Sequence, residues 1–425
     1  MTSLVLAFTI ILVTLFPACS PGTYTGLGYK FSIDKIQMEK APLKTFVTNL
    51  KYPFEDHTIT TRDGYVLTYH RVVASSPEVE GKRKEEAHRH PVLLVHGILQ
   101  SSAFYLAIPQ GLAYRLADAG FDVWVANHRG NPYSKAHLNL NPTLNSKYWQ
   151  FSFDEMGKFD LPAAVDYILK KTNKKTLSYI GFSMGTTMFW TFAHYWPDYM
   201  SKIDCMIAMA PIAIPNSLSV VISKFKNGAV NSILRSLNML NFYEFRPDYR
   251  RFAFIARSPC SGPETKKGWL CRGIVKLVCL LTGMEQDLLS YKDMLSTLDF
   301  MSAGTSIQSL FHLLQVGSAN EFMMYDYGER LNMFYYSGKT TPPKYDLTRV
   351  TVPVYLIQGG KDDYSVMKDT KILKERLDVN GKAYLFLEEE AKDYNHLDFF
   401  FADGVNEIIH QPVVKKLSEH VKYLL

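Results

Sequence analysis

Short runs of apolar residues recur along the chain, separated by turns or polar segments. Each is long enough for a buried strand but too short for most helices. The runs with the clearest boundaries begin at Pro91, Phe121, Leu177, Ile203 and Val352. Between the second and the third, residues 149–171 repeat apolar side chains at helical spacing. This alternation predicts a doubly wound parallel sheet flanked by helices, with functional loops at the carboxyl ends of its strands.

The segment before these runs alternates apolar and polar residues on both sides of Asp63-Gly64. Asp-Gly between two alternating runs is a strong hairpin signal, because both residues favour tight turns. Residues 51–71 therefore predict an antiparallel hairpin ahead of the parallel strands.

A long interval separates the run beginning at Ile203 from the run beginning at Val352. It spans roughly 140 residues, far more than the dozen or so that a strand crossover requires. Its Leu, Phe, Met and Tyr residues recur with helical periodicity. We therefore expect residues 214–350 to form an inserted, mainly helical cap between two parts of one core, 21–213 and 351–425. The apolar faces of this cap either pack only against the core or grip a substrate.

The N-terminus carries a continuous apolar run over 4–16, followed by the small residues of 17–20 (Pro-Ala-Cys-Ser). This pattern is typical of a signal-peptidase site, so residues 1–20 are predicted to be a secretory signal peptide. No Lys or Arg precedes the run, which leaves an N-terminal anchor as the alternative. No later stretch reaches about 18 uncharged apolar residues, so we expect a secreted mature chain without a transmembrane segment.

Composition narrows the function classes. The 425 residues fit either two or three domains or one enlarged domain with an insertion, and 47% apolar residues supply a large core. The net charge of +6 is small for this length, and the 26 Tyr and 26 Phe are not interleaved with basic clusters, so nucleic acid is excluded as a partner class. The mild basicity is compatible with an anionic lipid surface, and nothing in the sequence indicates an oligomeric state.

The run beginning at Leu177 leads into residues 181–185 (Gly-Phe-Ser-Met-Gly) and then into a predicted helix. Gly-x-Ser-x-Gly between a strand and a helix is typical of a nucleophile elbow, in which Ser183 occupies a strained turn above the sheet. Glycine is required at 181 and 185 because larger side chains would collide with the neighbouring backbone. An ordinary strand-to-helix turn is the alternative interpretation of so short a match.

A second glycine turn, His96-Gly97, ends the run beginning at Pro91. In an α/β-hydrolase the loop at this place provides one backbone N–H of the oxyanion hole, and the residue after the nucleophile provides the other. The predicted donors are therefore the amides of Ile98 and Met184. The alternative is an ordinary turn in which His96 is a structural residue.

The run beginning at Val352 ends in residues 359–363 (Gly-Gly-Lys-Asp-Asp), which places an acid at the carboxyl end of a strand. His396 follows after a predicted helix near 366–377 and a predicted strand near 383–387. Serine, acid and histidine thus occur in the chain order of the α/β-hydrolase triad. Their joint occurrence predicts an α/β-hydrolase fold and serine-dependent acyl transfer.

The cysteines fit an oxidising compartment. Cys19 falls within the predicted signal peptide, and Cys205 lies in an apolar run where we expect it to be buried. Cys260, Cys271 and Cys279 occupy one neighbourhood, which predicts one local disulfide and one free thiol.

Together these motifs resemble the acid lipase family, the gastric and lysosomal lipases and their animal relatives. The resemblance covers nearly the whole mature chain and rests on motifs in family order, at 52–53, 63–65, 96–97, 127–134, 153–157, 181–187, 325–328, 359–362 and 394–398. Two features depart from the family pattern. Phe182 and Met184 flank the serine where many relatives have His and Gln. No Asn-x-Ser/Thr sequon is present, which favours extracellular secretion over lysosomal delivery through glycan tags.

The resemblance implies a triad of Ser183, His396 and Asp362, because the family places its acid after Gly-Gly-x, and Asp363 is then a loop acid. It implies hydrolysis of triacylglycerol-type neutral-lipid esters at a lipid–water interface, through an acyl-enzyme and without metal or other cofactor. Steryl esters or short-chain esters are the alternative substrates. A lipid-binding protein that kept the scaffold but lost the chemistry is a further alternative, disfavoured because all three triad residues are retained.

The resemblance also implies a disulfide between Cys260 and Cys271, and residues 261–263 (Ser-Gly-Pro) allow the chain to turn back between them. Closing so short a loop is expected to stabilise the fold by about 2–4 kcal/mol. Cys279 is then a buried free thiol. Peptide mapping without reduction should recover the Cys260–Cys271 pair, and a peptide that bridges Cys279 to either partner would contradict it.

Overall fold

The computed structural model describes residues 42–73, 89–214, 242–246, 297, 300 and 303–422. The predicted signal peptide, the predicted Cys260–Cys271 disulfide and most of the predicted cap lie outside these residues. The cap boundaries at 214 and 350 therefore stay predictions. No helix within the described residues combines the length and the apolar character needed to cross a membrane.

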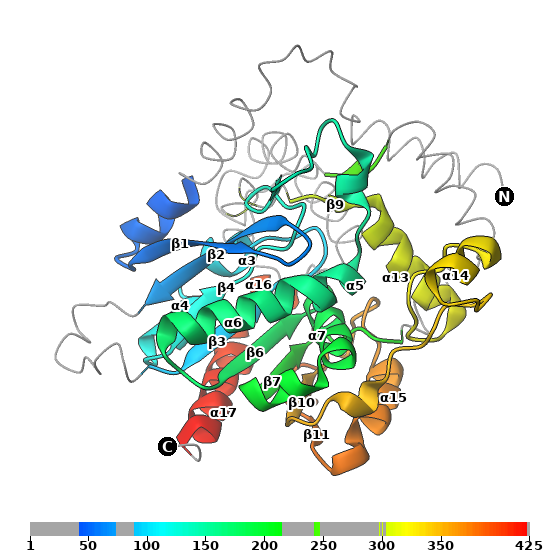
Figure 1. Cartoon of the computed structure of the whole chain (residues 1–425). Coiled ribbons are helices and arrows are strands. Elements are labelled where there is room, and N and C mark those ends of the chain that lie inside the picture. Colours follow the sequence, from blue (N-terminus) through cyan, green and yellow to red (C-terminus); the bar gives the residue numbers. More distant parts are fainter. Residues whose placement is uncertain are drawn as a thin grey trace, which may run out of the picture.

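A nine-stranded sheet forms the centre of the described part of the chain (Figure 1). Its strand order is β1-β2-β4-β3-β6-β7-β10-β11, and β5 pairs with β2. The strands of this sheet are β1 (Phe54–Thr60), β2 (Tyr65–Val73), β3 (Pro91–Val95), β4 (Asp122–Val125), β5 (Ala136–His137), β6 (Leu177–Phe182), β7 (Ile203–Met209), β10 (Val354–Ile357) and β11 (Ala383–Leu385). Two short strands pair separately, β8 (Glu244–Phe245) and β9 (Thr305–Ser306).

The two ends of the sheet pair differently. β1 and β2 form an antiparallel hairpin, and Gly64 adopts φ 95° in its turn. β2 then pairs antiparallel with β4, whereas all neighbours from β4 to β11 are parallel. Both the predicted hairpin and the predicted parallel sheet are confirmed.

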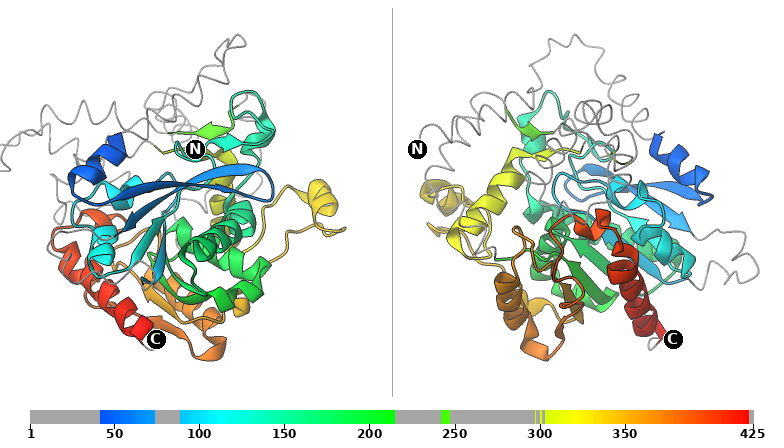
Figure 2. Two further views of the ribbon diagram at one scale, coloured as in Figure 1. Left: turned by 60° about the vertical axis from the view of Figure 1, so that its left-hand side comes forward. Right: turned by 180° about the vertical axis from the view of Figure 1, so that it is seen from behind.

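Helices cover both faces of the sheet, and α17 lies in front of the sheet when the molecule is seen from behind (Figure 2). One face carries a helix over 42–49, α3 (Ala103–Leu106), α4 (Leu112–Asp118), α16 (Asp398–Phe401), the π-helical η11 (Asn406–His410) and α17 (Gln411–Lys422). The other carries α5 (Phe153–Glu155), the π-helical η4 (Met156–Asp160), α6 (Leu161–Thr172), α7 (Met184–Tyr195) and α15 (Met367–Leu377), with α13 (Ile307–Ala319) packed beyond α5. The remaining described helices are α14 (Glu329–Tyr335) and the 3-10 turns η3 (Ser146–Trp149), η5 (Pro197–Lys202), η9 (Leu347–Arg349) and η10 (Asp378–Asn380).

Side chains alternate between two cores along the central strands. On β3, Val92 and Leu94 belong to the core under α4 and α17, whereas Leu93 and Val95 belong to the core under α6 and α7. Both faces of these strands are buried, which explains why the sequence shows nearly continuous apolar runs instead of alternation. Cys205 of β7 is buried, as predicted.

The prediction of one helix over 149–171 is wrong at the N-terminal end of that range. Residues 146–149 form the separate turn η3, and the continuous helical stretch begins only with α5. The Oγ atom of Ser152 accepts the Asp154 N–H at 3.2 Å, and Glu155 Oε2 accepts the Ser152 N–H at 2.7 Å. This capping box fixes the helix start.

The described C-terminal part of the predicted cap contacts the core at this helix start. Ser306 donates to the carbonyl oxygen of Phe151. His312 Nδ1 lies 2.8 Å from Ser152 Oγ, and its ring stacks on that of Phe153 with centroids 3.9 Å apart. Through these contacts α13 packs against α5.

Close packing of η4 against α7 generates a stability prediction. A Cβ at Gly157 would lie 1.9 Å from Thr191 Oγ1 and 2.7 Å from the Met188 carbonyl oxygen. Replacing Gly by Ala within a helix ordinarily stabilises by roughly 0.5–1 kcal/mol. Here the methyl group has no room, so we expect Gly157→Ala to destabilise the protein by about 3 kcal/mol, as overpacked cores do.

Thermal unfolding measures this effect, with Gly120→Ala as the control. A Cβ at Gly120 would meet nothing within 4 Å, so only its positive φ of 91° is unfavourable, at a cost of about 1 kcal/mol. The midpoint should fall further for Gly157→Ala than for Gly120→Ala. A Gly157→Ala protein that unfolds at or above the wild-type temperature would contradict the packing argument.

Candidate active site

Ser183 occupies a sharp turn between β6 and α7. Its backbone adopts φ 52° and ψ −121°, a combination that residues with a side chain rarely adopt. A Cβ at Gly181 would lie 2.9 Å from the carbonyl carbon of Gly185, and a Cβ at Gly185 would lie 2.4 Å from the Val95 carbonyl oxygen. Only glycine fits at these two positions, so the pentapeptide forms the elbow that its sequence predicts.

The side chains of Ser183, His396 and Asp362 form a continuous chain of hydrogen bonds. His396 Nε2 lies 2.9 Å from Ser183 Oγ, and His396 Nδ1 lies 2.8 Å from Asp362 Oδ2. The three residues follow β6, β11 and β10, at the carboxyl-end edge of the parallel strands. They are 3%, 8% and 4% exposed, so the hydrogen-bond chain is shielded from bulk water.

Backbone amides orient the Asp362 carboxylate. Its Oδ1 accepts the N–H groups of Tyr364 at 2.8 Å and Ser365 at 2.9 Å. Oδ2 is thereby turned toward the imidazole of His396. The neighbouring acid, Asp363, is exposed to solvent.

Two glycines allow the loop that carries the acid to approach the loop that carries the histidine. A Cβ at Gly359 would lie 2.4 Å from the Tyr394 carbonyl oxygen, and a Cβ at Gly360 would lie 2.1 Å from the Lys392 carbonyl oxygen. The N–H of Lys361 donates to the Tyr394 carbonyl at 3.0 Å. Side chains at 359 and 360 would force the loops apart and lengthen the histidine–carboxylate contact.

Two aromatic rings flank the His396 imidazole. The ring centroids of Phe182 and Tyr364 lie 5.0 Å and 5.2 Å from that of His396. Phe182 also contacts Phe399 and Phe400 with centroids 6.1 Å and 4.8 Å apart. Phe182 therefore presents an apolar wall that supports the imidazole. Partial burial, with the nearby Asp362 and Asp363 carboxylates, raises the pKa of Tyr364.

The predicted oxyanion loop lies against the nucleophile. A Cβ at Gly97 would lie 3.0 Å from Ser183 Cβ. Among the described residues, no acceptor is found for the backbone N–H of either Ile98 or Met184. Met184 is the first residue of α7, so its amide belongs to the unpaired N–H groups of a helix start. Two segments next to Ser183 therefore carry N–H groups available to an incoming ligand.

Three side chains hold this loop: His96, for which a structural role was the alternative prediction, and Gln100 and His128, which sequence reasoning missed. Gln100 Oε1 accepts the Gly97 N–H at 2.8 Å, and His96 Nδ1 lies 2.8 Å from the Gly97 carbonyl oxygen. His128 Nε2 lies 2.8 Å from the His96 carbonyl oxygen. A signal for His128 was present, because the polar segment 127–134 directly follows β4, which pairs in parallel with β3. Its loop and the His96 loop must therefore lie at one edge of the sheet.

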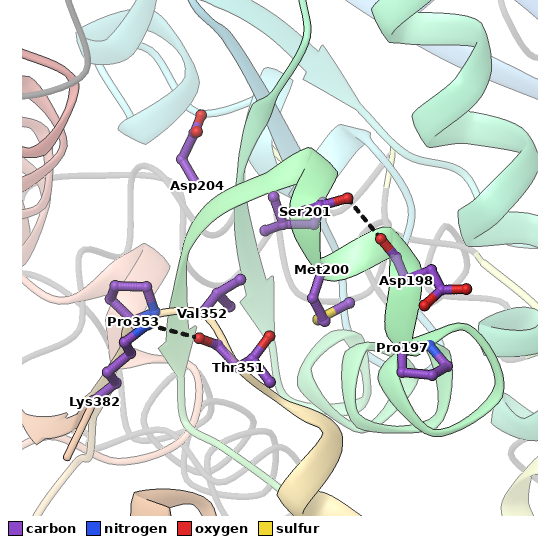
Figure 3. Close-up of a pocket in the computed structure, with 10 residues that line it drawn as sticks. Pro197, Asp198, Met200, Ser201, Asp204, Thr351, Val352, Pro353 and Lys382 are labelled. Carbon is purple, nitrogen blue, oxygen red and sulfur yellow. Dashed lines mark hydrogen bonds between the residues drawn. The ribbon is translucent and has the colours of Figure 1, made fainter. Parts of the chain in front are cut away.

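A hollow of about 620 Å³ lies at the opposite edge of the sheet (Figure 3). Its lining includes Asp204 at the start of β7 and Val352 just before β10. Lys382 at its rim donates to the Thr351 carbonyl at 3.2 Å. These are amino ends of strands, so the hollow is separate from the triad. In the ranges that the structure describes, no three His, Cys, Asp or Glu side chains are grouped to hold a metal ion.

Comparison with known proteins agrees with the fold and the motifs. A family model for the alpha/beta hydrolase fold matches residues 90–252, and a model for a partial alpha/beta-hydrolase lipase region matches residues 43–108. Human gastric triacylglycerol lipase is 31% identical over 384 residues, which cover 89% of this chain and 92% of that protein. Lipase 1 of Drosophila melanogaster is 33% identical over 376 residues, which cover 87% and 77%.

Among solved structures, a putative lipase from Sulfolobus solfataricus matches with a TM-score of 0.55 at 15% sequence identity, covering 86% of this chain and 94% of that one. At that identity the likeness concerns the fold alone. The gastric triacylglycerol lipases of human and mouse are more specific, because the match covers 92% and 90% of their length. The chain therefore belongs to the acid lipase family of α/β-hydrolases, together with gastric triacylglycerol lipase.

Proposed function

We propose that this protein is a serine lipase that hydrolyses carboxylic esters of neutral lipids. The observation that carries the proposal is the hydrogen-bond chain from Ser183 through His396 to Asp362, with the serine held at an elbow between strand and helix. Family membership supports the same reaction class, since the relatives are named as lipases.

The first half-reaction forms an acyl-enzyme. Ser183 Oγ attacks the ester carbonyl carbon while His396 Nε2 accepts the hydroxyl proton. The carbonyl oxygen becomes an oxyanion, to which the amides of Ile98 and Met184 donate. The tetrahedral intermediate then collapses, the ester C–O bond breaks, and His396 returns the proton to the departing alcohol.

The second half-reaction releases the acid. His396 removes a proton from a water molecule, whose oxygen attacks the acyl carbon of the Ser183 ester. When this intermediate collapses, the proton returns to Ser183 Oγ and the carboxylic acid leaves. Throughout, the Asp362 carboxylate accepts from Nδ1–H, which fixes the imidazole tautomer and stabilises the transient imidazolium.

Triacylglycerol-type esters are the proposed substrates, at a lipid–water interface outside the cell. The substrate class follows the names of the gastric relatives, and the compartment follows the predicted signal peptide. Steryl esters and short-chain esters are the alternative substrates within the same reaction class. Apart from the attacking water, every group in this mechanism is a side chain or a backbone amide of this chain.

Ser183→Ala should abolish ester hydrolysis, with a loss of at least about 10⁴-fold in kcat. The measurement is hydrolysis of a panel of triglycerides, steryl esters and short-chain esters by the wild-type and variant proteins. The control is Ser201→Ala, an exposed serine on η5 whose loss should leave activity within about twofold, as is usual for an isolated surface change. A folded Ser183→Ala protein with substantial activity would remove the serine from the mechanism.

The two adjacent acids provide a matched pair of variants. Asp362→Asn should lower kcat by about 10⁴-fold, because an amide at this position favours the wrong imidazole tautomer. Asp363→Asn makes the same chemical change on an exposed side chain and should leave kcat within about twofold. Steady-state kinetics on a soluble ester distinguish them. If Asp363→Asn proved the more damaging, the assignment of the acid would be wrong.

A further inference from the structure

Two histidines from different loops stack beside the elbow. The rings of His96 and His128 have centroids 3.7 Å apart, and both residues are almost fully buried, at 1% and 3% exposed. Burial lowers the pKa of His128 to about 4. Burial and the adjacent His128 ring lower the pKa of His96 well below its ordinary value. Both rings are therefore neutral at neutral pH, and each has one N–H to donate.

Hydrogen bonds assign the tautomer of each ring. The backbone N–H of His128 and the Asn131 amide approach His96 Nε2 at 3.4 Å and 3.3 Å, so Nε2 accepts and Nδ1 carries the hydrogen. That Nδ1–H donates to the Gly97 carbonyl at 2.8 Å. His128 Nε2 faces the His96 carbonyl at 2.8 Å, so it must be the protonated nitrogen.

These bonds fix two successive peptide groups of the oxyanion loop. The peptide that joins His96 to Gly97 has its C=O bound by His128 and its N–H bound by Gln100. The peptide that joins Gly97 to Ile98 has its C=O bound by His96. In a trans peptide the N–H points opposite to the C=O, so the His96 bond also sets the direction of the Ile98 N–H.

The loop needs such support, because the next residue is strained. Leu99 adopts φ 59°, which is unfavourable for a residue with a branched side chain. Strain at Leu99 can relax by rotation of the peptide that joins Ile98 to Leu99, and the hydrogen bonds on the two preceding peptide groups limit how far such a movement reaches the Ile98 N–H. Hydrogen bonding at the carbonyl also polarises the peptide, which strengthens its N–H as a donor.

The segment that carries His128 is itself anchored. The next residue, Arg129, donates to Asp160 Oδ1 at 2.9 Å and to Asp63 Oδ2 at 2.6 Å. Its guanidinium also lies 3.9 Å from the Tyr65 ring centroid. These contacts join the segment to the β1–β2 turn and to the start of α6, so His128 has a rigid support.

We propose that His128, His96 and Gln100 are positioning residues that hold the Ile98 N–H toward the oxyanion. The inference rests on the proposed function and deepens it. None of the three side chains touches the reacting atoms. They act through the two peptide groups of the oxyanion loop. His128, which follows β4, thereby contributes to the reaction of Ser183, which follows β6.

The test replaces His128 by Phe, which keeps a ring against His96 but has no N–H for the His96 carbonyl. On a soluble ester such as p-nitrophenyl butyrate, kcat should fall by about 10- to 100-fold, somewhat less than the loss of a whole oxyanion donor, while KM stays within about twofold. The Ki of a trifluoromethyl ketone should rise in parallel, because its hemiketal oxygen uses the same amide. His128→Gln restores an N–H donor and should recover most of the activity.

The matched control is His312→Phe. His312 is also a buried histidine that stacks on an aromatic ring, and its Nε2 lies 3.0 Å from a backbone carbonyl, that of Met323. His312 belongs to α13 and packs on α5, and none of its hydrogen bonds involves the oxyanion loop, so its loss should lower the unfolding temperature but leave kcat within twofold. Gln100→Leu is a second variant, which frees the Gly97 N–H and should lower kcat in the same way.

Equal effects of His128→Phe and His312→Phe on kcat, or an unchanged Ki for the ketone, would overturn the inference and leave the proposed function intact. If His128→Phe does not fold, Gln100→Leu decides by the same two readouts. A wild-type protein that neither hydrolyses the ester nor binds the ketone would overturn the proposed function and the inference together.

Discussion

Ser183 has a positive φ, which is unfavourable for a residue with a side chain. The site depends on the neighbouring residues that hold the serine in this conformation. Gly181 and Gly185 have no Cβ, so the backbones around the elbow can pack directly against each other at these positions. The Ser183 N–H donates to the Met209 carbonyl at 3.0 Å, which ties the turn to the neighbouring strand β7. The sheet thereby fixes the position of the serine hydroxyl, and the loops that carry His396 and Asp362 have to meet it there.

Those partners arrive on loops from β10 and β11, and the backbone determines how closely they meet. Gly359 and Gly360 pack against carbonyl oxygens of the loop that carries His396. Two backbone amides rotate the Asp362 carboxylate toward the imidazole, and aromatic rings support the imidazole from the side. The reacting groups therefore need little reorganisation before the reaction, which is the main condition for electrostatic catalysis in a buried site.

The sequence predicted the hairpin, the parallel strands, the elbow and the order of the triad, because each depends on a local pattern of apolar residues and glycines, but not the two-residue strands β5, β8 and β9. It did not predict contacts between residues that lie far apart in the chain, such as His96 on His128 or Phe182 on His396, because such contacts depend on strand order. The helix start at Phe153 was missed because the capping box at Ser152 outweighed the apolar periodicity before it. The cap boundaries, the signal peptide and the disulfide remain predictions.

The central claim is that Ser183 is a nucleophile activated by His396. Treatment of the full-length protein with a fluorophosphonate, followed by intact mass measurement and peptide mapping, tests it most directly. The reagent needs a nucleophilic serine beside a base but no particular lipid, so the result does not depend on the natural substrate. We expect a single adduct, located on Ser183 and lost in His396→Ala. No adduct, or an adduct on another side chain, would contradict the account.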